Sequence, residues 1–150
     1  ALENVAEQMR TKAQAKDDLI IVQVDAADRI YADYDRFIQI MVNLTQNAIQ
    51  FTKNGTITLS SFPDGDQQII QVKDTGIGIE KKDITSIWER FYKVDVSRKN
   101  TKFGESGIGL AVVQSLVMNH KGTIDVESNP GEGTIFTITL PTKAAIEKNS

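Results

Sequence analysis

The sequence of 150 residues contains no cysteine, so disulfide bonds and thiolate metal sites are excluded. It contains one histidine, His120, which also excludes a metal site built from several histidines. No apolar run approaches the roughly 18 residues that a membrane-spanning helix requires. The net charge of −3 lacks the basic excess of a nucleic-acid-binding domain. These absences favour a cytoplasmic globular domain that binds no nucleic acid.

The composition is that of an ordinary globular protein. Apolar residues make up 40% of the chain and charged residues 25%. A chain of this length can bury a core of its own but leaves little room for a second domain. We therefore expect residues 1–150 to form a single domain.

Apolar residues at spacings of three and four predict helices at residues 1–16, 35–51 and 107–119. The pattern at 35–51 is the most regular, because apolar residues recur along the whole segment: Phe37, Met41, Leu44, Ala48 and Phe51. The apolar face of the first helix is expected to pack on this domain's own sheet or to continue toward another part of the protein. A further short helical stretch is expected to lead to Ile87 and Trp88.

Runs rich in β-branched residues predict strands at residues 19–24, 56–62, 68–73, 123–128 and 134–140, with a short strand near 29–32. The connections 63–66 and 129–133 have the composition of hairpin turns, and hairpins join antiparallel strands. The sequence thus predicts an α/β two-layer sandwich, in which about three helices cover one face of a mixed, mostly antiparallel sheet. Residues 95–106 are expected to form a loop and residues 142–150 a frayed tail.

Three carboxamide side chains share one stripe of the helix at 35–51. Asn43, Asn47 and Gln50 follow the spacing i, i+4 and i+7. Their oxygens can bind Mg²⁺ and their N–H groups can donate to phosphate oxygens. A polar helix face open to water produces the same pattern and, taken alone, is the more common explanation.

A glycine-rich segment, Asp74-Thr75-Gly76-Ile77-Gly78-Ile79, follows directly on a predicted strand. A carboxylate at a strand end can accept a hydrogen bond from the exocyclic amine of adenine. Two glycines one residue apart allow the backbone to approach a flat ring closely. An ordinary turn between a strand and a helix also uses Asp and Gly, so both interpretations stay open.

A second glycine-rich segment, at residues 104–110, opens the helix predicted at 107–119. Free N–H groups at such a helix start favour phosphate binding. The segment lacks the Gly-Lys-Ser/Thr of a P-loop, and no strand precedes it as in a Rossmann turn. The residues before it include several cations, which suit a lid over a triphosphate but are also common on solvated surfaces: Arg90, Lys93, Arg98, Lys99 and Lys102.

Taken together and in order, five segments resemble the ATP-binding catalytic domain of bacterial sensor histidine kinases, in the superfamily that includes gyrase and the mismatch-repair ATPases. These segments are residues 43–52, 74–79, 87–95, 106–113 and 129–141. The resemblance implies a Bergerat-type fold that binds ATP and Mg²⁺, with residues 95–106 as the ATP lid. It implies nucleotide contacts for a set of residues in these motifs: Asn43, Asn47, Gln50, Phe51, Asp74, Gly76, Gly78, Ile79, Tyr92, Lys93, Ser106, Gly107, Ile108, Gly109, Leu110 and Thr134.

The resemblance also implies individual roles. Asn47 is similar to the Mg²⁺ ligand, and Asn43 and Lys93 occupy catalytic positions. Asp74 is similar to the carboxylate that reads adenine, with Thr134 near the base. Three residues depart from the family pattern: Gln50 stands in place of a lysine, Glu105 in place of a glycine and Trp88 in place of a phenylalanine. The first two affect the expected affinity and rate, and the third is expected to be a packing change.

The phospho-accepting histidine of this family lies on a separate dimerisation domain that precedes the catalytic domain. No such motif occurs here, and His120 matches a structural position. The expected partners are therefore that upstream domain and a response regulator, the expected setting is the cytoplasmic part of a membrane-anchored protein, and the isolated domain is expected to be monomeric. Two alternatives stay open: a serine kinase of the anti-sigma type, and a non-catalytic nucleotide-binding module.

Overall fold

The computed structural model describes residues 2–24, 34–88 and 109–141. Five strands form one sheet in the order β1-β2-β3-β5-β4. They are β1 (Leu19–Val24), β2 (Thr56–Asp64), β3 (Gln67–Asp74), β4 (Thr123–Asn129) and β5 (Gly133–Pro141). The β1–β2 pair is parallel and the other three pairs are antiparallel. The predicted mixed, mostly antiparallel sheet is confirmed.

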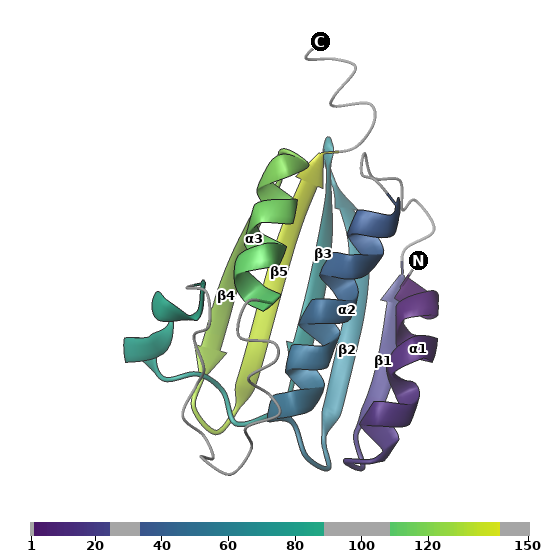
Figure 1. Cartoon of the computed structure of the whole chain (residues 1–150), viewed down its shortest axis with the longest axis vertical. Coiled ribbons are helices and arrows are strands. Elements are labelled where there is room, and N and C mark those ends of the chain that lie inside the picture. Colours follow the sequence, from purple (N-terminus) through teal and green to yellow (C-terminus); the bar gives the residue numbers. More distant parts are fainter. Residues whose placement is uncertain (1, 25–33, 89–108, 142–150) are drawn as a thin grey trace.

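Three helices cover one face of this sheet (Figure 1). They are α1 (Leu2–Gln14), α2 (Tyr34–Phe51) and α3 (Gly109–Asn119). α2 lies between the other two and contacts both. The predicted two-layer sandwich is therefore also confirmed.

The core lies between the helices and the covered face of the sheet. In β2, β3 and β5 every second side chain is buried, as the pleat of a half-covered sheet requires. The first helix contributes five side chains that are each at most 3% exposed: Leu2, Val5, Ala6, Met9 and Ala13. Because α1 contacts α2 and β1, its apolar face packs on this domain's own core.

The hairpin between β2 and β3 is tighter than the sequence predicted. Pro63 and Asp64 belong to β2 and pair with Gln68 and Gln67, so only Gly65 and Asp66 form the turn. Gly65 has a φ of 62°, a conformation that a two-residue hairpin turn requires and that glycine adopts without steric cost. The prediction of a four-residue turn was wrong because Pro63 can occupy a strand where the partner needs no N–H from it.

Two short 3₁₀ turns replace the single helical stretch expected before Trp88. They are η1 (Lys81–Asp83) and η2 (Ser86–Trp88). The indole of Trp88 meets Phe136 edge to face, with ring centroids 5.9 Å apart. Trp88 therefore has the packing role that the sequence predicted.

Several predicted segments lie outside the described residues: the short strand near 29–32, the lid at 95–106, the first residues of the helix at 107–119 and the tail at 142–150. Within the three described ranges, no helix is both long enough and apolar enough to cross a membrane.

Candidate functional site

Asp74 ends β3, and its side chain is only 5% exposed. Its Oδ1 accepts a hydrogen bond of 2.9 Å from the backbone N–H of Gly76. Burial raises the pKa of the Asp74 carboxyl, and the charge of Asp18 adds to this, while hydrogen bonds from the backbone N–H groups of Gly76 and Thr134 oppose it. A buried carboxylate held by backbone donors is thus positioned at one end of the sheet.

Gly76 follows Asp74 and packs against the end of α2. The N–H of Ile77 donates to the carbonyl oxygen of Phe51 over 3.1 Å. A Cβ on Gly76 would lie 2.2 Å from that same oxygen and 2.8 Å from Oγ1 of Thr52. Glycine is therefore required here by contact with the protein's own backbone, whatever ligand the site takes.

Gly78 packs in the same way against the turn between β4 and β5. Its φ is 77°, and a Cβ on it would lie 2.2 Å from the carbonyl oxygen of Asn129. The N–H of Gly131 in this turn donates to the carbonyl oxygen of Ile77 over 2.7 Å. The segment 74–79 is thus held between the end of α2 and the β4–β5 turn.

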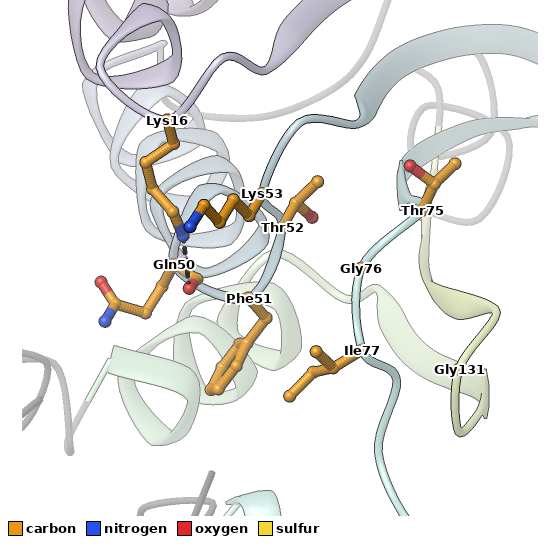
Figure 2. Close-up of a pocket in the computed structure, with 9 residues that line it drawn as sticks. All are labelled: Lys16, Gln50, Phe51, Thr52, Lys53, Thr75, Gly76, Ile77 and Gly131. Atoms are coloured by element: carbon orange, nitrogen blue, oxygen red, sulfur yellow. Dashed lines mark hydrogen bonds between the residues drawn. The ribbon is translucent and has the colours of Figure 1, made fainter. Parts of the chain in front are cut away.

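A pocket of about 400 Å³ opens beside this segment (Figure 2). Figure 2 shows the side chains of Phe51 and Ile77 on its two sides, with Gly76 just before Ile77 on the segment that follows β3. The pocket is lined by Lys16, Gln50, Phe51, Thr52, Lys53, Thr75, Gly76, Ile77 and Gly131. It therefore combines an aromatic and an aliphatic side chain with two lysines and an amide, a lining suited to a flat anionic ligand.

Lys16 ties the α1–β1 connection to the end of α2. Its Nζ donates to the carbonyl oxygens of Ile49 and Gln50 over 2.5 and 2.7 Å. The ammonium thus satisfies two of the carbonyls that a helix leaves unpaired at its C-terminus, where a positive charge is also favoured by the helix dipole. Desolvation lowers the pKa of Lys16, with Asp18 acting in the opposite direction and Lys53 in the same one.

The carboxamide stripe predicted on α2 is retained in the structure. Asn43, Asn47 and Gln50 are all half-buried and lie on this one helix, and Gln50 reaches the pocket. Among the described residues, no three His, Cys, Asp or Glu side chains converge as a metal site. Mg²⁺ is held mainly by phosphate and water oxygens and takes only one or two oxygen ligands from the protein. The amide oxygens of this stripe are able to supply such ligands.

Asp74 and Thr134 face each other as partners in the β3–β5 ladder, and Thr134 is also 5% exposed. Ile79 joins them through Ser128, whose Oγ lies 2.6 Å from the N–H of Ile79 and 2.8 Å from Oγ1 of Thr134. The structure therefore groups the predicted residues of segment 74–79 with Thr134.

The remaining predicted residues are divided between α3 and residues outside the description. Gly109 begins α3, and Leu110 in its first turn is half-buried. Five predicted site residues lie outside the described residues: Tyr92, Lys93, Ser106, Gly107 and Ile108.

Sequence reasoning missed several residues of this region, chiefly Lys16, Lys53, Ile77, Ser128 and Gly131. Ile77 and Gly131 lie inside the motifs at residues 74–79 and 129–141, so the sequence carries a signal for both positions. Lys16 carried none, because it acts on residues more than thirty positions away in the chain, and Ser128 carried none for its bond to Ile79, 49 positions away.

Comparison with known families and proteins agrees with this geometry. Residues 32–144 match the family described as histidine kinase-, DNA gyrase B-, and HSP90-like ATPases. The chain is 50% identical over 142 residues to the sensor histidine kinase YclK of Bacillus subtilis, covering 95% of this chain and 30% of YclK. It is 40% identical over 121 residues to the circadian input-output histidine kinase CikA of Synechococcus elongatus, covering 80% of this chain and 16% of CikA. The chain thus spans less than a third of the length of these relatives.

Solved structures share the fold. Full-length ShkA in complex with AMPPNP superposes with a TM-score of 0.81 at 31% identity, covering 94% of this chain and 29% of that one. The nucleotide-free catalytic domain of histidine kinase ThkA gives a TM-score of 0.78 at 24% identity, covering 93% of this chain and 89% of that one. The sequence match, the fold and the glycine-bounded carboxylate lead to one assignment: the chain belongs to the family of histidine kinase-, DNA gyrase B- and HSP90-like ATPases and corresponds to the catalytic domain of sensor histidine kinases.

Proposed function

We propose that residues 1–150 form one domain that binds Mg²⁺-ATP and donates its γ-phosphoryl group to a histidine on a separate dimerisation domain. The observation that carries this proposal is the buried Asp74 carboxylate, fixed by the Gly76 N–H beside a pocket of about 400 Å³. Within residues 2–24, 34–88 and 109–141, no cationic side chain pairs with this carboxylate. Burying an unpaired carboxylate is costly, and a ligand that donates a hydrogen bond to it offsets that cost.

Adenine provides the matching donor. Its 6-amino group donates hydrogen bonds, whereas the 6-oxo group of guanine only accepts them. Phe51 and Ile77, on the two sides of the pocket, offer apolar surface to a flat ring. Gly76 and Gly78 let this segment pack closely against Phe51 and Asn129, and this packing would hold the segment in place beside the base.

The phosphates would extend along the carboxamide stripe of α2. Asn47 would hold Mg²⁺, supported by Asn43 one turn earlier, and the bound ion would neutralise phosphate charge. Gln50, at the edge of the pocket, would donate its amide N–H to a phosphate oxygen in place of a lysine's charge. Lys93 and the segment Ser106–Leu110 would supply the remaining phosphate contacts.

The acceptor histidine lies outside this chain. In the described part of the chain, the only imidazole is that of His120, at the end of α3, and its Nδ1 lies 2.7 Å from the carbonyl oxygen of Leu116. A carbonyl oxygen only accepts, so Nδ1 carries the proton and His120 caps its helix. In the proposed transfer, the bond from the γ-phosphorus to the bridging oxygen breaks, a bond to the incoming imidazole nitrogen forms, and ADP leaves.

The proposed partners follow from this reaction. They are the histidine-containing dimerisation domain of the same kinase and a response regulator that takes the phosphoryl group onward. We place the domain on the cytoplasmic side of a membrane-anchored protein, and we expect the isolated domain to be a monomer.

Two measurements test the proposal. Calorimetric titration with ADP and ATP, with and without Mg²⁺ and with GTP as control, should give adenine-selective binding that Mg²⁺ strengthens for ATP. Incubation with labelled ATP and a purified dimerisation domain should then place an acid-labile, base-stable label on that domain. Binding without transfer would instead support a regulatory module, an acid-stable label would support a serine kinase, and absence of nucleotide binding would refute the proposal.

A further inference from the structure

The hydroxyl of Ser128, near the end of β4, is the centre of a small hydrogen-bond cluster. Its Oγ lies 2.6 Å from the backbone nitrogen of Ile79, 3.0 Å from the carbonyl oxygen of Gly133 and 2.8 Å from Oγ1 of Thr134. These three partners come from the glycine-rich segment and from the first two residues of β5. Ser128 therefore connects the segment 74–79 with the strand that carries Thr134.

The direction of each hydrogen bond follows from counting protons. A serine hydroxyl has one proton to donate and two lone pairs with which to accept. The carbonyl oxygen of Gly133 can only accept, so it receives the Ser128 proton, and the N–H of Ile79 can only donate, so it uses one lone pair. The contact with Thr134 must then run from the Thr134 hydroxyl to the second lone pair of Ser128.

This direction fixes the chemistry of Thr134. Its single hydroxyl proton is used by Ser128, so toward the site the Thr134 oxygen can only accept. Asp74 lies opposite Thr134 in the β3–β5 ladder, and its ionised carboxylate also only accepts. The two buried side chains at this end of the sheet therefore present acceptors and no donor.

We propose that Ser128 is a positioning residue that orients the Thr134 hydroxyl as an acceptor and thereby makes the site select a base that carries an amine over one that carries an oxo group. The inference rests on the proposed nucleotide function and adds to it a determinant of base specificity. Ser128 acts through Thr134 and contacts no ligand in this arrangement. Without the Ser128 oxygen, the Thr134 proton is released and can be donated to an oxo group.

The test compares ADP with inosine diphosphate, in which a 6-carbonyl oxygen and a proton on N1 replace the 6-amine and the unprotonated N1 of ADP. Their dissociation constants are measured by calorimetry for the 150-residue chain and for Ser128→Ala. We expect the preference for ADP to fall by about fivefold in Ser128→Ala, the value of one neutral hydrogen bond. An unchanged ratio, with both nucleotides weakened equally, would mean that Ser128 has only a structural role and would overturn the inference.

Two further variants make the result independent of any folding defect in Ser128→Ala. Ser128→Thr keeps a hydroxyl at the same position and should restore the wild-type ratio. Thr134→Val removes the hydroxyl that reads the base and should lower the ratio as Ser128→Ala does; a wild-type ratio in this variant would also overturn the inference. If the unsubstituted chain binds neither nucleotide, the proposed function fails, whereas selective binding of ADP with an unaltered ratio in all variants refutes only the role of Ser128.

Discussion

The backbone N–H of Ile77 donates a 3.1 Å hydrogen bond to the carbonyl oxygen of Phe51, the last residue of α2. This bond joins the end of the helix that carries the carboxamide stripe to the segment that follows Asp74. It pairs a helix-terminal carbonyl that has no partner within the helix, and it sets the separation of the two sides of the pocket. The two motifs identified separately in the sequence therefore meet through backbone contact.

Replacement of Gly76 by alanine should destabilise the protein. The new Cβ would lie 2.2 Å from the carbonyl oxygen of Phe51, so the backbone must shift. We expect Gly76→Ala to lower the free energy of unfolding by about 1–3 kcal/mol, measured by urea denaturation. The matched control is Gly65→Asn, because no atom lies within 4 Å of a Cβ at Gly65 and asparagine tolerates its φ of 62°. Equal urea midpoints for the two variants would contradict the packing argument.

Replacement of Lys16 should loosen the end of α2. Lys16→Met removes two hydrogen bonds to the carbonyls of Ile49 and Gln50 and a positive charge at the helix C-terminus. The expected loss is about 1–2 kcal/mol of unfolding free energy. Lys12→Met removes an exposed lysine from the last turn of α1 and should leave the urea midpoint nearly unchanged. A similar loss in both variants would show that general charge effects, and not capping by Lys16, are responsible.

Removal of the Asp74 charge should weaken adenine nucleotides and leave the fold intact. A hydrogen bond to a charged group contributes about 1.5–3 kcal/mol, so Asp74→Asn should lower ADP affinity about tenfold or more. Calorimetric titration measures this change, and the circular dichroism spectrum checks the fold. Asp125→Asn, on the exposed side of β4, should bind ADP as the unsubstituted chain does. If Asp74→Asn bound ADP with unchanged affinity, the adenine base would have to bind at another site than beside Asp74.

The stability of the ligand-free protein should depend on pH through Asp74. Burial raises the pKa of Asp74 above its ordinary value of 3.8, so the folded state binds this proton more tightly than the unfolded state does. The bound proton stabilises the folded state fully at pH values below the pKa that Asp74 has in the unfolded state. This stabilisation is lost as the pH rises through the pKa that Asp74 has in the folded state. Urea unfolding from about pH 4 to about pH 8 should show the unsubstituted chain losing stability relative to Asp74→Asn. Parallel curves would mean that the carboxyl titrates as if exposed.

The isolated chain should not phosphorylate itself. His120 is the single histidine of the sequence and its ring is held at the end of α3 by the contact with Leu116, while the proposed acceptor lies on another domain. Incubation of the chain alone with labelled ATP should therefore give no acid-labile label. A label that disappears in His120→Gln would identify His120 as an acceptor and contradict this prediction.

Local chemistry was enough to predict most elements. The apolar spacing of α2 and the hairpin between β4 and β5 depend on residues close together in the chain, so their signal is visible in the sequence. The length of the β2–β3 turn was not predicted, because strand residues and turn residues overlap in composition at Pro63 and Asp64.

The sequence by itself determined the class of fold and the motifs that mark Asp74, Asn47 and the two glycines of segment 74–79. Only the tertiary structure decided why these glycines are needed, since the atoms they approach belong to Phe51 and Asn129. It alone also identified Ser128, which lies 49 residues from Ile79 in the chain. The physical reason is that spacing and turn chemistry are encoded locally, whereas the hydrogen bonds that orient a buried hydroxyl exist only after distant segments have packed together.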